Sequence, residues 1–283
     1  MSTDLRRTGI DFLPQRGHWG AKQTRRMDRA RPLHPVARIA VVFTAATLIW
    51  LAVIALGDAI WGDGYDRARH VASAFAITLL VAPMVLLACR RLDQVPLEKP
   101  SPRLFALGAA GYLIPAVIGV TACLLLGWLT IDTNGPAGVT ILSVLALAGL
   151  VLLYEALPEE LVFRGYLYRN LLALMPAWVA VFAQAALFTL FGMLIGAAGS
   201  LGRVVLFFGF AIVQGFIRQA TGSVWAPVGF HVAFQTAEQI AGSSWNRFTV
   251  NDLALLQEVA LGLVPLALGV AVVHLLLRRR RPA

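Results

Sequence analysis

Long apolar runs separated by short charged segments make up the chain from about residue 39 onward. Each run can hold the roughly 20 residues that a helix needs to cross a membrane. The pattern therefore predicts an all-α integral membrane protein, a bundle of about eight transmembrane helices. The predicted spans lie within residues 39–57, 71–89, 104–131, 133–154, 170–202, 203–221, 224–240 and 253–277.

The composition agrees with a chain buried in lipid. Hydrophobic residues make up 58% of the 283 and charged residues only 14%, whereas a soluble domain carries about 25% charged residues. Cys89 and Cys123 both lie inside apolar runs, so we expect two small buried residues and no disulfide framework.

The basic residues predict the orientation of the bundle. With eight spans, 20 of the 24 lysines and arginines fall on the side of the two termini, and the other side holds only Arg67, Arg69, Arg203 and Arg247. Loops rich in Lys and Arg stay in the cytoplasm. We therefore expect a multi-pass protein of the cell membrane with cytoplasmic termini. The net charge of +9 reflects this topology, and we expect no nucleic acid partner.

Three regions are expected: a disordered basic cytoplasmic tail at residues 1–35, the helical bundle at 36–277 and a short basic cytoplasmic tail at 278–283. The first apolar run is longer than the 7–15 residues of a signal-peptide core, so we expect it to remain as the first span. The basic tails either bind anionic lipid headgroups or serve only as positive-inside anchors.

One segment concentrates carboxylates inside the apolar region. Glu155, Glu159 and Glu160 precede Arg164, and each ionisable group in a span costs roughly 2.5–3.5 kcal/mol. Pro158 should break or kink the helix, or begin a new one. Glu160 and Arg164 are four apart and predict an ion pair. Glu159 then remains free, as a general base requires. Alternatively, both acids simply decorate the first turn of a helix.

A second polar cluster lies in the seventh predicted span. His231, Gln235 and Glu238 are spaced i, i+4 and i+7, which places an imidazole, an amide and a carboxylate on one helix face. We expect this face to look into the bundle. A structural histidine is the alternative interpretation. Because both clusters are reached from the cytoplasmic side in this topology, they can meet in the inner half of the bundle.

These residues resemble a known family. Residues 159–165, EELVFRG, match its EExxxR motif, and residues 221–227, TGSVWAP, followed by His231, are similar to its TGS-W-P…HxxxN segment. The family is CPBP, the intramembrane proteases related to type II CAAX prenyl endopeptidases and to bacteriocin-processing and abortive-infection proteins. The similarity covers about residues 142–239. It implies an eight-helix bundle with a cytoplasm-facing cavity.

The resemblance also implies roles for single residues. Glu159 would activate the hydrolytic water, Glu160 and Arg164 would support it, and His231 would hold the water or the oxyanion. Gln235 stands where the family has Asn.

The family's FxxxH motif is Phe188…Gly192 in this chain, so the second histidine is replaced by a glycine. Gln184 and Glu238 are candidates for partial compensation.

A bound metal is not expected. Catalytic zinc takes three protein ligands, and the loss of the second histidine leaves Glu159, Glu160 and His231, with Glu238 as the one further candidate. We therefore expect no cofactor, although the family analogy would allow zinc.

Three functions follow from the sequence. The first is an intramembrane endopeptidase that acts on a peptide or membrane-anchored protein. The second is a pseudoprotease that binds membrane peptides or proteins in the same cavity, and Gly192 is the residue that favours it. The third is a transporter that uses Glu159, His231 and Glu238 as a proton relay.

Overall fold

The computed structural model describes residues 33–62, 64–93, 96–242 and 244–278, and these residues are almost entirely helical. The two predicted basic tails, residues 1–35 and 278–283, lie almost wholly outside the described residues. Their disorder and their binding to lipid headgroups stay predictions.

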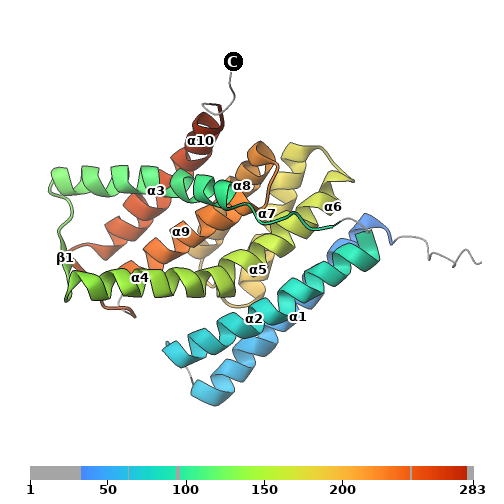
Figure 1. The fold of residues 1–283 in the computed structure, drawn as a ribbon, viewed down its shortest axis with the longest axis horizontal. Helices are drawn as coiled ribbons and strands as arrows, with labels where there is room; N and C mark the ends of the chain where they lie inside the picture. Colours follow the sequence, from blue (N-terminus) through green and yellow to red (C-terminus); the bar gives the residue numbers. More distant parts are fainter. Residues whose placement is uncertain (1–32, 63, 94–95, 243, 279–283) are drawn as a thin grey trace, which may run out of the picture. The chain divides into compact units, whose positions relative to one another are not determined.

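The first three helices are continuous rods that begin at clear caps. They are α1 Pro35–Trp61, α2 Arg67–Ala88 and α3 Pro102–Leu125, and a π-helical turn, Cys89–Asp93, extends α2. α1 and α2 lie side by side (Figure 1). The Asp66 side chain accepts a hydrogen bond from the backbone N–H of Arg69 at the start of α2, and Ser101 does the same for Leu104 at the start of α3. Such caps satisfy N–H groups that have no partner within the helix.

The fourth span is a single helical run through Pro158, so a complete break at this proline is wrong, whereas the alternative that Pro158 begins a new helical segment agrees with its place in the first turn of α5. α4 Ala137–Val151, α5 Leu157–Glu160 and α6 Tyr168–Leu172 are joined by π-helical segments Leu152–Ala156 and Leu161–Leu167. Together they form 36 residues of continuous helix. The wider π turns on both sides of Pro158 change the hydrogen-bond pattern where its N–H is missing.

The remaining helices complete the bundle. They are α7 Ala177–Leu194, α8 Leu201–Thr221, α9 Trp225–Ala241 and α10 Val264–Arg278, the last preceded by a π-helical segment, Leu255–Leu263. In the described part of the chain, seven helices are long and apolar enough to cross a membrane, and α9 has 17 residues. The chain is therefore an all-α, multi-pass membrane protein, as predicted. A short antiparallel pair, β1 Ile131–Thr133 and β2 Phe248–Val250, joins two of its loops.

α9 is held against α3 by glycines on both helices. A Cβ added to Gly108 would lie 1.8 Å from the carbonyl oxygen of Ala226, and one added to Gly229 would lie 2.0 Å from that of Phe105. The backbones of α3 and α9 therefore touch directly, which only residues without a side chain permit. This contact fixes the helix that carries His231.

The up-and-down course of the helices gives the bundle two ends. We call the end formed by residues 64–66, 126–136, 195–200 and 244–254 the distal face, and the end formed by 33–34, 96–101, 173–176 and 222–224 the terminal face. Ion pairs tie the terminal face together: Asp93 pairs with Arg38 and Arg169 at 3.2 and 2.8 Å, and Glu98 pairs with Arg218 at 2.7 Å. Figure 1 shows β1 at the distal face.

Candidate active site

A cavity of about 740 Å³ lies among the helices and reaches the residues singled out in the sequence. This volume is within the range of small-molecule and peptide pockets. One side is aromatic and the other is polar. We call Trp50, Phe188, Phe207 and Phe210 the aromatic wall, and Glu155, Gln235, Glu238 and Gln239 the polar wall. Glu159 and His231 also line the cavity.

The predicted pair of Glu160 and Arg164 is present behind the cavity. Nη1 of Arg164 lies 3.1 Å from Oε1 of Glu160, and both side chains are completely buried. The guanidinium carbon of Arg164 stands 4.6 Å from the centre of the Phe188 ring, a cation–π contact. Neither Glu160 nor Arg164 lines the cavity. Their position therefore suits the support of other residues rather than contact with a substrate.

Glu160 also holds His231. Oε1 of Glu160 lies 2.9 Å from Nδ1 of His231, and it accepts a further hydrogen bond of 3.3 Å from Nε2 of Gln214. An ionised carboxylate only accepts hydrogen bonds. When Nδ1 donates to Glu160, Nε2 presents its lone pair to the other side.

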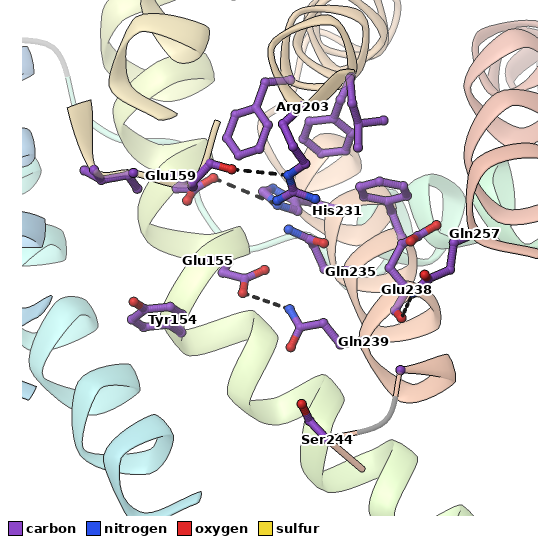
Figure 2. A pocket seen from close by; sticks show the side chains of 18 of the residues that line it. Tyr154, Glu155, Glu159, Arg203, His231, Gln235, Glu238, Gln239, Ser244 and Gln257 are labelled. Carbon is purple, nitrogen blue, oxygen red and sulfur yellow. Dashed lines mark hydrogen bonds and ion pairs between the residues drawn. The ribbon is translucent and has the colours of Figure 1, made fainter. Parts of the chain in front are cut away.

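Glu159 lies on that other side. Its Oε2 is 3.9 Å from Nε2 of His231, and its side chain remains 11% exposed, to the cavity. Within the described part of the chain its carboxylate accepts no hydrogen bond. The sequence-based prediction that Glu160 is paired and Glu159 is left free thus agrees with the geometry. Figure 2 shows the carboxylate of Glu159 pointing toward His231.

The polar wall extends from this pair along two helices. Gln235, Glu238 and Gln239 follow His231 on α9, and Glu155 lies one turn before Glu159. Nε2 of Gln239 donates a 2.8 Å hydrogen bond to Glu155, and Nε2 of Gln257 donates one of 3.0 Å to the backbone oxygen of Glu238. The predicted polar face of His231, Gln235 and Glu238 does look into the bundle (Figure 2).

The two candidates for compensation lie in different places. Glu238 lines the cavity, but Gln184 does not. Gln184 is buried and donates to the backbone oxygens of Ala211 and Val181, at 2.7 and 3.0 Å. Its amide therefore joins α7 to α8 and does not replace a histidine in the cavity.

The space beside Gly192 is filled. A Cβ at this position would lie 2.5 Å from Cδ1 and Cε1 of Phe207, a residue of the aromatic wall. The missing histidine has therefore left no gap, because an aromatic ring from α8 occupies the place where its side chain would begin.

Gln214 belongs to the site but was not predicted. It is fully buried on α8, where its amide donates to Glu160 and to the backbone oxygen of Pro227 at 3.1 Å. The available signal was an amide inside an apolar span, four residues before Arg218.

The donor set does not fit a catalytic zinc ion. In the described ranges no group of three or more His, Cys, Asp and Glu side chains is arranged to hold a metal. Oε1 of Glu160 is already shared by Arg164, Gln214 and His231, and the guanidinium beside it repels a cation. The absence of a cofactor stays a prediction.

The cavity opens at the distal face. Its outer rim is formed by Tyr65, by 195–197, by Arg203 and by Ser244 and Trp245, and no residue of the terminal face as defined above lines it. The opening of the cavity and the two termini therefore lie at opposite ends of the bundle. The prediction of cytoplasmic termini and the prediction of a cytoplasm-facing cavity cannot both be correct.

Comparison with known proteins identifies the central segment. The model of a family described as "Type II CAAX prenyl endopeptidase Rce1-like" matches residues 141–237. This segment extends from α4 to α9 and contains Glu159, Arg164 and His231. Searches of curated proteins and of solved structures gave no match.

This segment is therefore similar to the type II CAAX prenyl endopeptidases.

Proposed function

We propose that this protein is an intramembrane endopeptidase that uses Glu159 as the general base. The observation that carries the proposal is the pair at the inner end of the cavity: the carboxylate of Glu159 lies 3.9 Å from Nε2 of His231 and has no hydrogen-bond partner among the described residues. The other side of the imidazole is fixed by Glu160 at 2.9 Å.

A water molecule that contacts both groups can be activated in this geometry. It donates one hydrogen bond to Glu159 and the other to Nε2 of His231. Glu159 takes a proton as the water oxygen attacks the carbonyl carbon of the scissile peptide bond. The tetrahedral intermediate collapses when Glu159 returns this proton to the leaving nitrogen, which breaks the C–N bond and gives a new carboxyl end and a new amine.

The other predicted site residues have separate tasks in this proposal. Glu160, Arg164 and Gln214 are positioning residues, because they fix the imidazole and do not reach the cavity. Gln235 lines the cavity one helical turn beyond His231, and in this proposal its amide N–H donates to the oxyanion.

The position of the protein in the cell is part of the proposal. The bias of basic residues to the terminal face supports insertion in the cell membrane with both termini in the cytoplasm. Anionic lipid headgroups are proposed partners of the basic tails.

A pseudoprotease is the second candidate, and one contact favours it. Phe207 fills the space beside Gly192, so a second imidazole is missing and its place is closed. Positioning of the attacking water would then rest on His231 and Glu159 alone. Such a protein would bind peptides along the cavity without cleaving them.

A peptide screen separates the two candidates. The purified protein is incubated with a mixed library of prenylated and unmodified peptides, and new termini are identified by mass spectrometry. An endopeptidase produces fragments that disappear in Glu159→Gln and persist in Glu258→Gln, a matched change at an exposed glutamate outside the cavity. Peptide binding without any fragments would instead establish the pseudoprotease.

A further inference from the structure

The entrance of the cavity lies at the distal face, whereas most of the basic residues lie in the terminal half of the bundle. The rim is built from helix ends of the distal face, namely the end of α7, the start of α8 and the segment after α9. The basic residues described in the terminal half include Arg90, Arg91 and Lys99. The described residues of the distal half include only four arginines, Arg67, Arg69, Arg203 and Arg247.

A second, smaller cavity confirms where the opening lies. It has a volume of about 290 Å³, includes Gly64, Asp66 and His70, and shares Tyr154, Glu155 and Gln239 with the main cavity. Both cavities therefore approach the polar wall from the distal face. They meet at the 2.8 Å hydrogen bond between Gln239 and Glu155.

We infer that the substrate is a peptide segment on the extracytoplasmic side of the membrane, which enters through the distal face and lies along the polar wall. The inference rests on the proposed function for the cleavage itself. It combines a prediction with an observation: the positive-inside rule predicts that the terminal face lies in the cytoplasm, and the residues at the rim of the cavity belong to the other end of the bundle.

The interior suits an extended chain. From His231 to Gly242 α9 advances about 16 Å at about 1.5 Å per residue, and an extended strand of about five residues covers this distance at about 3.3 Å per residue. Amides of Gln235 and Gln239 can bond the peptide backbone on one side. The aromatic wall offers apolar contacts to alternate side chains on the other.

The rim carries one arginine that is available to such a peptide. Arg69 is paired with Asp58 at 2.6 Å. Among the residues that the structure describes, the guanidinium of Arg203 donates to one backbone oxygen, that of Ala197 at 3.2 Å, and stands 5.4 Å from the centre of the Phe207 ring. No ion pair of Arg203 is present among the described residues. Arg203 is therefore placed to meet an acidic group or the carboxyl end of the substrate at the entrance.

Cysteine labelling tests the inference directly. Ser244→Cys places a thiol at the rim and Lys99→Cys places one at the terminal face, and both positions are exposed. Both native cysteines are buried, so the wild-type chain is the unlabelled reference. Each variant is expressed in a bacterial host, and spheroplasts are treated with a membrane-impermeant maleimide before and after permeabilisation.

The inference predicts that Ser244→Cys is labelled in intact spheroplasts and Lys99→Cys only after permeabilisation. The reverse pattern, or labelling of both from the same side, would overturn it. Labelling does not depend on hydrolysis, so a protein that proves to be a pseudoprotease still gives a clear result.

A second measurement examines the path of the substrate. Right-side-out vesicles that contain Ser244→Cys receive the peptide library from outside, before and after modification with a polyethylene glycol maleimide. The bulky group at the rim should reduce cleavage at least tenfold, whereas the same treatment of vesicles that contain Lys99→Cys should not. Equal cleavage before and after modification of Ser244→Cys would contradict entry through the distal face.

Discussion

The imidazole of His231 is held from behind by Glu160, whose Oε1 lies 2.9 Å from Nδ1. This contact fixes the rotation of the ring, and when Nδ1 is the donor it leaves the lone pair on Nε2. Nε2 is thereby directed to the cavity, where Oε2 of Glu159 lies 3.9 Å away. Two adjacent glutamates on one helix thus have different surroundings, because successive helical residues point about 100° apart.

Removal of Arg164 should destabilise the protein strongly. Its guanidinium is the one cation that contacts the buried carboxylate of Glu160 in the described part of the chain. Arg164→Ala should therefore cost about 3–5 kcal/mol of unfolding free energy, measured by thermal unfolding in detergent. Glu160→Gln in the same background should recover part of this loss. Strictly additive effects of the two substitutions would show that the pair is not coupled.

Gln214 should contribute to the same network. Gln214→Leu removes one donor from Glu160 and one from the backbone oxygen of Pro227, at a cost of about 1–3 kcal/mol. Gln219→Leu, an exposed position on the same helix, is the control and should change the melting temperature little. If the two variants melt together, the hydrogen bonds of Gln214 have no net effect on stability.

The contact between α3 and α9 should tolerate no side chain at its glycines. Gly229→Ala would bring a Cβ to 2.0 Å from the backbone oxygen of Phe105, so the two helices must separate and His231 must move. We expect a loss of at least about 1–3 kcal/mol. Gly149→Ala has no atom within 4 Å of its new Cβ and should leave the melting temperature unchanged or raise it. Similar melting temperatures for both variants would refute the direct backbone contact.

A histidine at position 192 should be effective only if Phe207 makes room for it. Gly192→His alone places its Cβ 2.5 Å from the Phe207 ring, which must shift, and we expect little gain in cleavage. Gly192→His combined with Phe207→Ala should cleave peptides faster than Phe207→Ala alone, since a second imidazole would help to position the water. Initial rates of peptide cleavage measure this difference. A double variant no faster than its Phe207→Ala parent would show that the position does not reach the water.

Much of the fold was predictable because hydrophobic spans and local spacing are properties of the sequence itself. The helical bundle followed from the apolar runs, and the pair of Glu160 and Arg164 followed from their spacing of four. The continuation of the helix through Pro158 was not predictable. It depends on the π-helical turns on both sides, which change the hydrogen-bond pattern where the proline has no N–H. Sequence patterns indicate where a helix tends to end, but they do not show which neighbouring turns adapt.

The parts of the site that depend on packing were not predictable. Gln214 donates to Glu160 only because α8 packs against the fourth span. Gln184, a predicted candidate for compensating the replaced histidine, instead donates to the backbone of α8. The direction of the cavity likewise depends on how the helices diverge, which no periodicity encodes. The expectation of a cytoplasm-facing cavity came from the family resemblance and not from these residues. Because the rim of the cavity lies opposite the termini, this expectation conflicts with the predicted cytoplasmic position of the termini.

The central claim is that Glu159 is the base in peptide hydrolysis, and single-turnover kinetics on one cleaved peptide test it most directly. The cleavage rate and the peptide Kd are measured for the wild type, for Glu159→Gln and for the control Glu258→Gln. The account predicts that Glu159→Gln lowers the cleavage rate about 10²–10⁴-fold while its Kd stays within a few-fold of the wild-type value, and that the control behaves as the wild type. A Glu159→Gln variant that cleaves at the wild-type rate would contradict the account.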